Sequence, residues 1–260
     1  MSKRWVTFDL DGTLMQNPFG AWVFPEIAEV ISGKLGRKID IILEMVAEHE
    51  LRMEQGRYVD AYDWDDILGL RCKQLGMEAP FEIEPLLRKH AVAPKISLLE
   101  PGILEILGAI KSRGYSLAVV TNGFYKFQAP VMESLGLLDY FDEILTPEKV
   151  GTGKPDPKMI DVLTGEVVAH VGDRLDHDVQ MANRKNVTSV FVDRNLPDEL
   201  KEFDPRQRSS DQRMRTRCME KWKKESRNTT TTALSSVLIP AVVIHSIEEL
   251  LTILDERKGG

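Results

Sequence analysis

The chain has 260 residues, enough to bury a full hydrophobic core, and its 42% hydrophobic and 29% charged residues are typical of an ordinary globular protein. A formal net charge of −7 and an isoelectric point near 5.4 argue against a general binder of nucleic acids or of membrane surfaces. The two cysteines, Cys72 and Cys218, lie far apart without the spacing of a zinc site, which favours a reducing compartment; we expect the cytoplasm.

The first predicted element is a buried strand that ends in two acids. Residues 5–14 read WVTFDLDGTL, an apolar, β-branched run followed by Asp9, Asp11 and Gly12. Acids two positions apart project to the same side of an extended backbone, and a glycine lets the chain turn sharply and present backbone N–H groups. The segment could therefore hold a cation and an anion together. An ordinary strand with an Asp-Gly turn has the same residues, so this segment alone leaves both interpretations open.

Residues 17–96 are predicted to form a separate helical domain. A stretch with two prolines and several aromatic residues leaves the first strand, and apolar residues then recur at helical spacing to about Pro94 without a β-alternating run. A helical block of this size, entered and left through prolines, indicates an insert in another domain.

From residue 97 the pattern alternates between strands and helices. The predicted strands cover residues 116–120, 143–145, 167–171, 188–192 and 241–244, and the predicted helices cover 103–110, 127–135, 157–163, 178–184 and 247–254. This rhythm indicates βαβ units, hence an α/β core with a Rossmann-like, doubly wound parallel sheet over residues 1–16 and 97–260. The apolar run 237–244 is read as a core strand, since it is far shorter than the roughly 20 residues of a membrane helix.

Residues 197–236 do not fit the alternating pattern. The middle of this insertion, residues 206–227, is rich in Lys and Arg, and a short basic helix is expected around residues 214–224, before Asn228 and four threonines at 229–232. We favour a solvated, partly mobile surface insertion; a basic arm that steers an anionic substrate or partner is the alternative. The insertion leaves the place of the last strand in the sheet open.

Polar clusters follow several of the predicted strands. Asp9 and Asp11 follow the first, and the other clusters are Thr121 with Asn122, and Asp173 with Asp176 and Asp178; Lys154 lies in a loop before a helix. The carboxyl ends of parallel strands meet at one edge of a sheet, where such folds bind ligands. Carboxylates from separate strands suit Mg²⁺, which would neutralise a phosphoryl group.

These residue types provide the parts of a phosphoryl transfer. Asp9 could attack phosphorus to form an aspartyl-phosphate, and Asp11 could protonate the leaving oxygen and then activate water. The Thr121 hydroxyl and the Asn122 backbone N–H could hold phosphoryl oxygens, with Lys154 balancing charge. No glycine-rich nucleotide-binding motif is present, which argues against a P-loop or a dinucleotide site.

Four segments, FDLDGTL, VVTNG, GKPDP and VGDRLDHD, resemble in this order motifs I to IV of the haloacid dehalogenase superfamily, and the helical insert resembles its C1-type cap. The resemblance implies Asp9 as nucleophile and metal ligand, Asp11 as acid and base with its backbone carbonyl on Mg²⁺, and Asp173 as metal ligand. It places Thr121, Asn122 and Lys154 on the phosphate. Asp178 matches the second acid of motif IV and would act on the metal through water or by orienting Lys154.

The motif IV segment also departs from the family pattern or carries extra polar residues. Arg174 replaces the usual Ser or Thr after the motif IV aspartate, and either adds a cation near the site or points to solvent. Asp176 is an extra acid for which a surface role is favoured over metal ligation. His170 and His177 are expected to pack or to lie at the surface.

Asp11 separates the reaction classes of this superfamily. A dehalogenase attacks carbon and needs neither an acid at this position nor magnesium, so a Mg²⁺-dependent phosphatase acting on a small phosphorylated metabolite is favoured. A phosphomutase, a phosphonatase that uses a cap lysine (Lys34, Lys38, Lys73 or Lys89), and a non-catalytic binding module remain alternatives. We expect a monomer, with a dimer left open, and neither nucleic acid nor membrane as partner.

The cap is expected to set substrate specificity. Aromatic side chains can stack on a ring and arginines can bind anions. The residues considered for this role are Phe19, Trp22, Arg52, Arg57, Tyr58, Tyr62 and Trp64, with packing of the helices as the alternative for each.

Overall fold

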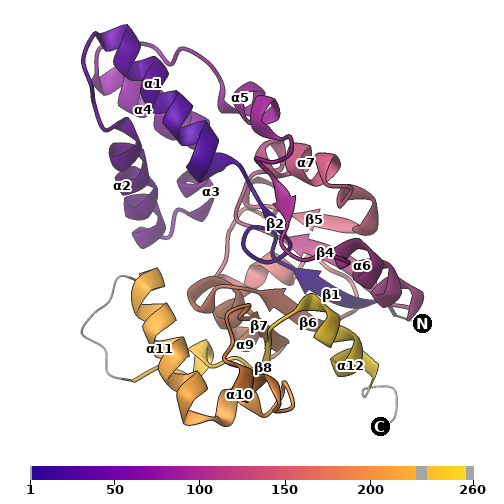
Figure 1. The fold of residues 1–260 in the computed structure, drawn as a ribbon. Coiled ribbons are helices and arrows are strands. Elements are labelled where there is room, and N and C mark those ends of the chain that lie inside the picture. The colour runs from indigo at the N-terminus through magenta and orange to yellow at the C-terminus, as the bar shows by residue number, and fades with distance from the viewer. Residues whose placement is uncertain (1, 227–232, 256–260) are drawn as a thin grey trace.

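The computed structural model describes residues 2–226 and 233–255, and its centre is a six-stranded parallel sheet (Figure 1). The strand order is β5-β4-β1-β6-β7-β8, so the first strand lies in the middle and the last strand at one edge. The strands are β1 (Arg4–Phe8), β4 (Ser116–Val120), β5 (Glu143–Leu145), β6 (Glu166–Gly172), β7 (Thr188–Val192) and β8 (Val242–Ile244).

Both faces of the sheet are covered by hydrophobic layers, because successive side chains along each buried strand point to opposite faces. Val6 and Phe8 pack on the face that carries α6 (Ile103–Ser112) and α12 (Leu250–Asp255). Trp5 points to the opposite face, where it packs with residues of α9 (Gln180–Arg184) and of the 3₁₀ turn Pro157–Ile160. This doubly wound α/β core confirms the predicted fold class.

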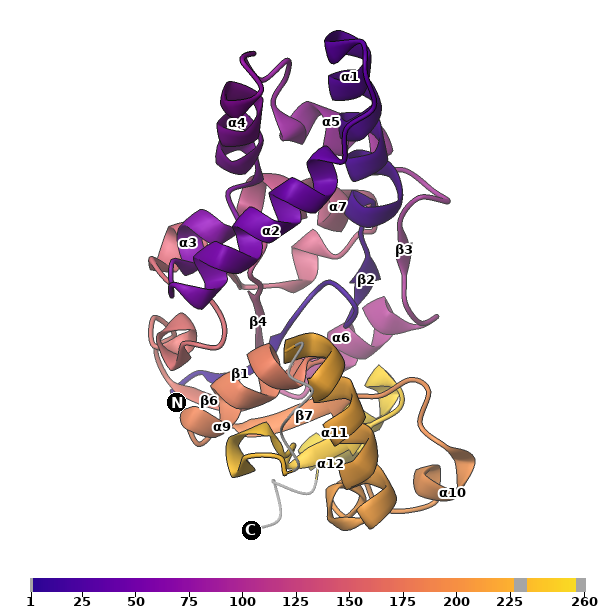
Figure 2. The ribbon, with the colours of Figure 1, turned by 90° about the vertical axis from the view of Figure 1, so that its left-hand side faces the viewer.

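Five helices occupy the segment between β2 (Met15–Gln16) and β3 (Ser97–Leu98) and stand to one side of the sheet (Figure 2). The two short strands pair antiparallel, with Met15 opposite Leu98, and close the base of the segment. Their pairing was not predicted, since two residues carry no alternating pattern. The division into a core and a cap at 17–96 stays a prediction. The helices are α1 (Phe24–Leu35), α2 (Ile41–Glu54), α3 (Tyr58–Ala61), α4 (Trp64–Gln74) and α5 (Ile83–His90).

The insertion at 197–236 packs onto the sheet through two helices, α10 (Asp198–Lys201) and α11 (Gln212–Ser226). Leu200, Met214 and Cys218 are buried against Phe191 of β7 and Val243 of β8. The basic helix expected at 214–224 is α11, but its apolar stripe makes the described part of the insertion a layer of the core rather than a solvated loop. Asn228 and the threonines at 229–232 lie outside the described residues.

Several predicted elements differ in detail. The helix expected at 157–163 is a single 3₁₀ turn, and the one expected at 178–184 begins with a π-helical turn at Leu175–Val179 before α9. The core strand expected over 237–244 starts only at Val242, after a proline that interrupts it. The remaining helices are α7 (Tyr125–Ser134) and α8 (Pro147–Val150). Among the described residues, none of the helices is both long and apolar enough to cross a membrane.

Candidate active site

A cavity of about 230 Å³ lies where the carboxyl ends of the sheet strands face the helices of the 17–96 segment. Asp9 and Asp11 reach it from the end of β1, Thr121 and Asn122 from the end of β4, and Lys154 from the loop after α8. The sequence places these residues up to 145 positions apart, and the parallel sheet brings them to one edge.

Lys154 joins two carboxylates at the floor of this cavity. Its buried Nζ donates to Asp9 Oδ1 at 2.6 Å and to Asp178 Oδ1 at 2.6 Å. Asp178 also accepts a hydrogen bond from His170 Nε2 at 3.1 Å and one from the Arg174 backbone N–H at 3.0 Å. The second aspartate of motif IV therefore contacts the lysine directly, and its role at the site stays a prediction.

The charges of this cluster follow from burial and from its neighbours. Burial raises the pKa of Asp9, and the carboxylates of Asp178 and Asp173 add to this rise, while Lys154 opposes it. Burial acts against the charged form of Asp178, but Lys154 and His170 outweigh it and hold that pKa far below its usual range. The two carboxylates likewise overcome the burial of Lys154 and raise its pKa. Lys154 is thus a fixed cation, and Asp178 a fixed anion.

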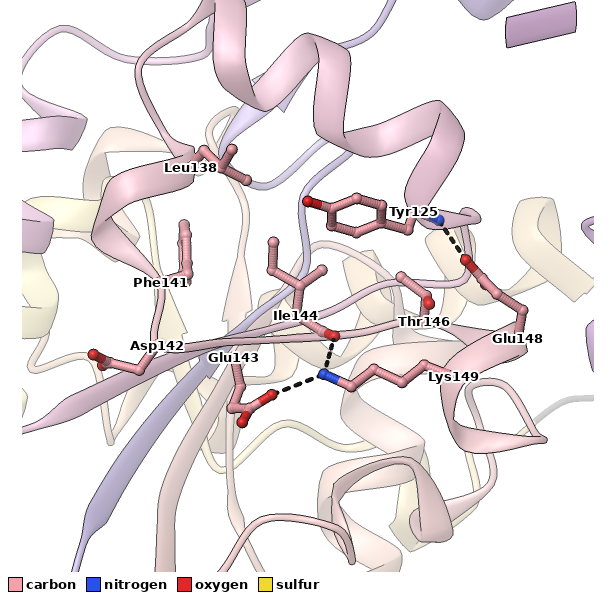
Figure 3. A pocket seen from close by; sticks show the side chains of 9 residues that line it. All are labelled: Tyr125, Leu138, Phe141, Asp142, Glu143, Ile144, Thr146, Glu148 and Lys149. Carbon is pink, nitrogen blue, oxygen red and sulfur yellow. Dashed lines mark hydrogen bonds and ion pairs between the residues drawn. The ribbon is translucent and has the colours of Figure 1, made fainter.

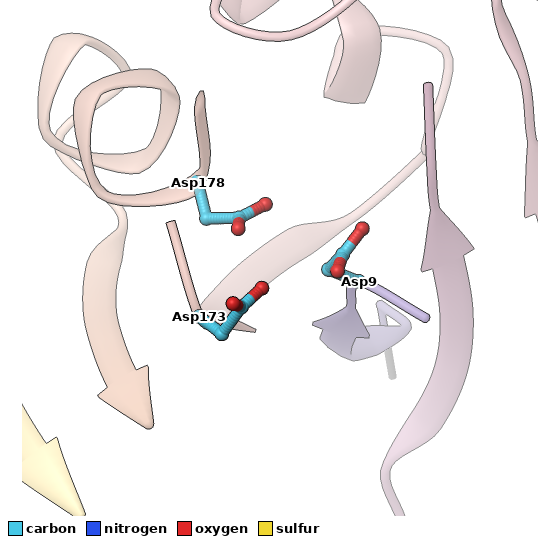
Figure 4. Close-up of side chains that lie close together, drawn as sticks. All are labelled: Asp9, Asp173 and Asp178. Carbon is cyan, nitrogen blue, oxygen red and sulfur yellow. The ribbon is translucent and has the colours of Figure 1, made fainter. Parts of the chain in front are cut away.

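Asp9, Asp173 and Asp178 form a group of carboxylates from three segments, shown in Figure 4. One oxygen of each lies within 4.8 Å of the others, and Asp173 Oδ1 is buried with no hydrogen-bond partner in the described structure. A hard divalent cation would satisfy that oxygen and offset the repulsion, so the residues present fit Mg²⁺. Lys154 bonds to both Asp9 and Asp178, but Asp178 also accepts from His170 and from the Arg174 backbone N–H, so its oxygens are the most fully engaged of the three. We therefore expect Asp9 and Asp173 to be the side chains that hold an ion.

The side chain of Asp11 is outside this carboxylate group. Its Oδ2 accepts a hydrogen bond from Gln128 Nε2 at 2.7 Å, and the same Nε2 lies 3.2 Å from Thr121 Oγ1. Burial raises the pKa of Asp11, while the hydrogen bond from Gln128 opposes the rise. A carboxyl that keeps its proton to higher pH can act as a general acid. Metal ligation by Asp11, which the resemblance assigned to its backbone carbonyl, stays a prediction.

The Asn122 side chain fixes the loop that carries Lys154. Its Oδ1 accepts from the Lys154 backbone N–H at 2.7 Å, and its Nδ2 donates to the Lys154 carbonyl at 3.0 Å. Nδ2 also donates to the Tyr62 hydroxyl at 3.3 Å, which ties the 17–96 segment to the core. The Thr121 hydroxyl accepts from the Gly123 backbone N–H at 3.1 Å, and its own proton is free to reach a ligand.

Two glycines allow the carboxylate-bearing strands to approach each other. Gly12 has φ = +83°, and a Cβ there would lie 2.8 Å from Asp173 Oδ2. A Cβ on Gly172, at the end of β6, would overlap the Asp178 carboxylate. The Asp-Gly turn noted in the sequence is thus required for the cluster to close.

Three of the residues considered for substrate contact line the cavity: Phe19, Tyr62 and Trp64. Arg52 does not, because it is buried in ion pairs with Glu48 at 2.9 Å and Asp66 at 2.7 Å. Trp22, Arg57 and Tyr58 are also absent from its lining, as are the lysines considered for a phosphonatase, Lys34, Lys38, Lys73 and Lys89. Among the described lining residues, Lys154 is the one lysine.

The motif IV loop, residues 172–178, is held by hydrogen bonds within the loop and by one from His170 of β6. Arg174 pairs with Asp176 through two hydrogen bonds, at 3.0 and 2.7 Å, and it borders the cavity rather than pointing only to solvent. His170 is buried and links Thr7, whose Oγ1 lies 2.9 Å from its Nδ1, to Asp178. Burial lowers the pKa of His170, so the neutral ring donates from Nε2 to Asp178.

The insertion reaches the same loop, which the sequence did not predict. Glu225 of α11 accepts from the backbone N–H groups of Leu175 at 3.0 Å and Asp176 at 3.4 Å. Lys221, one turn earlier on α11, lies 3.2 Å from Glu225 and 3.7 Å from Asp173 Oδ2. Nothing in the sequence pattern relates a basic helix at 212–226 to motif IV, because the contact is purely tertiary.

A separate cavity of about 520 Å³ lies along the edge strand β5 (Figure 3). Lys149 closes one side of it by donating to Glu143 at 2.8 Å and to the Ile144 carbonyl at 3.1 Å. None of the carboxylates of the Asp9 cluster lines this cavity.

The motif order and the geometry agree with a comparison against known families. The model of the haloacid dehalogenase-like hydrolases matches residues 3–184, which is more than half of the chain. The chain belongs to the haloacid dehalogenase-like hydrolases. This result confirms the resemblance seen in the four motifs and the prediction that the protein is a hydrolase.

Curated relatives of this hydrolase are mostly phosphatases by name, in agreement with the predicted branch of the family. A "Probable phosphatase IndB" of Dickeya dadantii is 27% identical over 215 residues, covering 78% of this chain and 87% of the relative. A phosphoserine phosphatase of Thermus thermophilus is 35% identical over 121 residues, which are 44% of this chain and 49% of that protein.

Solved structures share the fold over nearly the whole chain. A haloacid dehalogenase-like phosphatase from Thermococcus onnurineus superposes with a TM-score of 0.64 and 26% identity, covering 96% of this hydrolase and 97% of that chain. An L-2-haloacid dehalogenase from Xanthobacter autotrophicus has a TM-score of 0.58 at 21% identity, covering 97% and 98%. The second likeness shows the fold alone, so the choice of reaction depends on the site.

Proposed function

We propose that this hydrolase is a Mg²⁺-dependent phosphatase that cleaves small phosphate monoesters through an aspartyl-phosphate on Asp9. The observation that carries the proposal is the pairing of Asp9, held by Lys154 at 2.6 Å, with a second carboxyl, Asp11, on the same cavity. A nucleophile and a separate acid of raised pKa are what the two steps of ester hydrolysis need.

In the first step an Asp9 oxygen attacks phosphorus, and the bond from phosphorus to the ester oxygen breaks. Asp11 gives its proton to that leaving oxygen. In the second step water attacks phosphorus, Asp11 takes the proton of the water, and the bond to Asp9 breaks. The Thr121 hydroxyl and the Lys154 ammonium are positioned to stabilise the charge on the phosphoryl oxygens.

Asp9 and Asp173 would hold Mg²⁺, with Asp178 fixing Lys154 beside them. The bound ion would supply charge neutralisation at the phosphoryl group. Buried, unpartnered Asp173 Oδ1 supports this assignment. A cation there would also favour the ionised, nucleophilic form of Asp9, whose pKa is otherwise raised by burial.

Asp11 also argues for phosphate chemistry over dehalogenation. Attack on carbon with loss of halide needs no proton donor at the leaving group, yet Gln128, which also bonds to Thr121, holds a carboxyl at this position. A phosphomutase would use the same residues and is the second candidate. Relatives are named for phosphoserine, glyceraldehyde 3-phosphate and phosphoglycolate, so their names do not agree on a substrate for this chain. A cytoplasmic location and a monomeric state stay predictions.

The test is release of inorganic phosphate from a panel of phosphorylated metabolites, with and without Mg²⁺. We expect release that stops on chelation and is lost in Asp9→Asn, which keeps the size of the side chain but removes the nucleophilic charge. Asp139→Asn, a substitution at an acid far from the cavity, serves as the matched control and should keep the activity. Activity that survives in Asp9→Asn would contradict the proposal, and exchange of phosphate between two positions of a substrate without release would favour the mutase.

A further inference from the structure

A second cavity next to the active site, distinct from the one along β5, has a volume of about 530 Å³ and lies between α2 of the 17–96 segment and α11 of the insertion. His49, Met53 and Glu54 line it from α2, and Lys224 and Glu225 line it from α11. Figures 1 and 2 both place α11 opposite α2 and α3, on the side of the sheet edge that carries the active site.

This cavity shares lining residues with the active-site cavity, so the two lie side by side. Tyr62, Arg174 and His177 border both of them. The active-site cavity, at about 230 Å³, has room for a phosphoryl group and a small neighbouring fragment, so a longer ester would extend past Arg174 into the second cavity.

The wall formed by α11 is held in a defined position. Glu225 accepts from the Leu175 and Asp176 backbone N–H groups, and Lys221 lies 3.2 Å from Glu225. Farther along the same helix, Arg217 makes hydrogen bonds of 2.8 to 3.1 Å to the Asp193 carboxylate. The insertion therefore presents its end to the active site as a fixed surface rather than as a free arm.

The lining is polar and carries more carboxylates than cations. Four acids line the cavity against two cations, Arg174 and Lys224, and Arg174 pairs with one of those acids, Asp176. The remaining acids, Glu50, Glu54 and Glu225, come from two separate helices and outnumber Lys224. A second anionic group on a substrate would be repelled there. Hydroxyl groups both donate and accept, so they can bond to carboxylates and to an ammonium alike.

Aromatic side chains lie where the second cavity meets the active-site cavity. His49 stacks on Trp64 with ring centroids 5.1 Å apart and meets Tyr62 edge-on at 4.7 Å. Among the described residues of this lining, Met53 is the one aliphatic side chain, so the cavity offers little apolar surface for a purine or a hydrocarbon chain.

We propose that the cavity between α2 and α11 binds the non-reacting part of the substrate, and that this part is polyhydroxylated, as in a sugar or sugar-alcohol monophosphate. The inference rests on the proposed phosphatase function. It gives the insertion at 197–236 a role in substrate specificity.

The experiment compares kcat/KM for a hexose 6-phosphate with kcat/KM for acetyl phosphate, whose acyl part is too short to reach the second cavity. We expect Lys224→Ala to lower the ratio of the two values about tenfold or more, the worth of one hydrogen bond to a charged group. Met53→Trp, which fills the cavity from the opposite wall, should lower the ratio by a similar or larger factor. Lys223→Ala is the matched control, because this neighbouring lysine lines a different cavity, and it should leave the ratio unchanged.

The outcomes that would contradict the sugar-binding inference differ from those that would contradict the phosphatase function. An unchanged ratio in both Lys224→Ala and Met53→Trp, or a wild-type preference for a nucleoside monophosphate or phosphoglycolate over every sugar phosphate tried, would overturn this inference and leave the phosphatase proposal standing. Lack of phosphate release from every phosphate ester tried and from acetyl phosphate, an acyl phosphate, would overturn the proposed function and this inference with it.

Discussion

Asp11 lies among neutral hydrogen-bond partners, whereas Asp9 lies beside a lysine. Gln128 holds Asp11 Oδ2 at 2.7 Å, and the Lys154 ammonium holds Asp9 Oδ1 at 2.6 Å. This difference in surroundings lets one carboxyl carry a proton while the other acts as a nucleophile.

Gln128 is predicted to set the pH range of the first chemical step. Its N–H bond to Asp11 stabilises the charged carboxylate and so lowers a pKa that burial raises. Replacing it with leucine removes the donor, so the pKa of Asp11 rises further and the acid keeps its proton to higher pH. The alkaline limb of the profile of kcat/KM against pH should therefore move to higher pH in Gln128→Leu.

The profile is measured with the same phosphate ester for both proteins, at saturating Mg²⁺. Gln74→Leu, at an exposed glutamine that bonds to Arg71 on α4, controls for the loss of an amide and should leave the limb in place. An alkaline limb that moves to lower pH in Gln128→Leu would show that Asp11 is not the acid whose ionisation is being observed.

The candidate catalytic residues could be predicted from the sequence motifs, but the neighbouring residues that hydrogen-bond to them could not. Asp9, Lys154 and Asp173 occur in short motifs whose spacing is informative by itself. Gln128 and His170 touch the site only because the fold turns them toward it, and His170 was expected to have no more than a packing or surface role. A lone glutamine or histidine carries no local signal of such a contact.

At the scale of elements, a buried arginine connects the insertion to the sheet, in addition to the hydrophobic packing. Arg208 donates to the carbonyls of Leu200 and Val243 at 2.9 Å each, and it pairs with Glu249 at 2.8 and 2.9 Å. Its side chain is 1% exposed, and it also donates to the carbonyls of Lys201 at 2.8 Å and Phe203 at 3.0 Å.

Arg208→Ala is predicted to destabilise the protein strongly. Removing the guanidinium breaks the ion pair with Glu249 and the hydrogen bonds to buried carbonyls, a loss of about 3–5 kcal/mol in the free energy of unfolding. Urea denaturation followed by circular dichroism measures it. Arg213→Ala is the control from the same insertion, since Arg213 pairs with Asp211 at the surface, and the change should be much smaller. Equal effects of the two substitutions would contradict the anchoring role of Arg208.

Most strands of the core were predictable from the sequence, whereas the contacts between distant segments were not. Strands 116–120, 143–145 and 188–192 lie at the expected positions, because buried parallel strands are continuous apolar runs between turn residues. The packing of α11 was missed because the basic residues dominate its composition and hide the two buried positions, Met214 and Cys218.

At the scale of the whole molecule, one edge of a parallel sheet gathers the chemistry, and two other segments surround it. The sequence predicted the sheet and the edge, since the motifs that contain Asp9, Thr121 and Asp173 each follow a strand. It could not give the strand order, in which β8 pairs with β7 at the edge, nor the approach of the insertion to the helices of the 17–96 segment. Both depend on contacts between residues that are distant in the sequence.

The central claim is that Asp9 becomes phosphorylated during turnover. The direct measurement is rapid acid quenching of enzyme mixed with a phosphate ester and Mg²⁺, followed by peptide mass spectrometry. The account predicts the added mass of one phosphoryl group on the peptide that contains Asp9, and no such addition in Asp9→Asn. Steady turnover by an enzyme in which no phosphorylated Asp9 can be trapped, or in which the group sits on another residue, would contradict it.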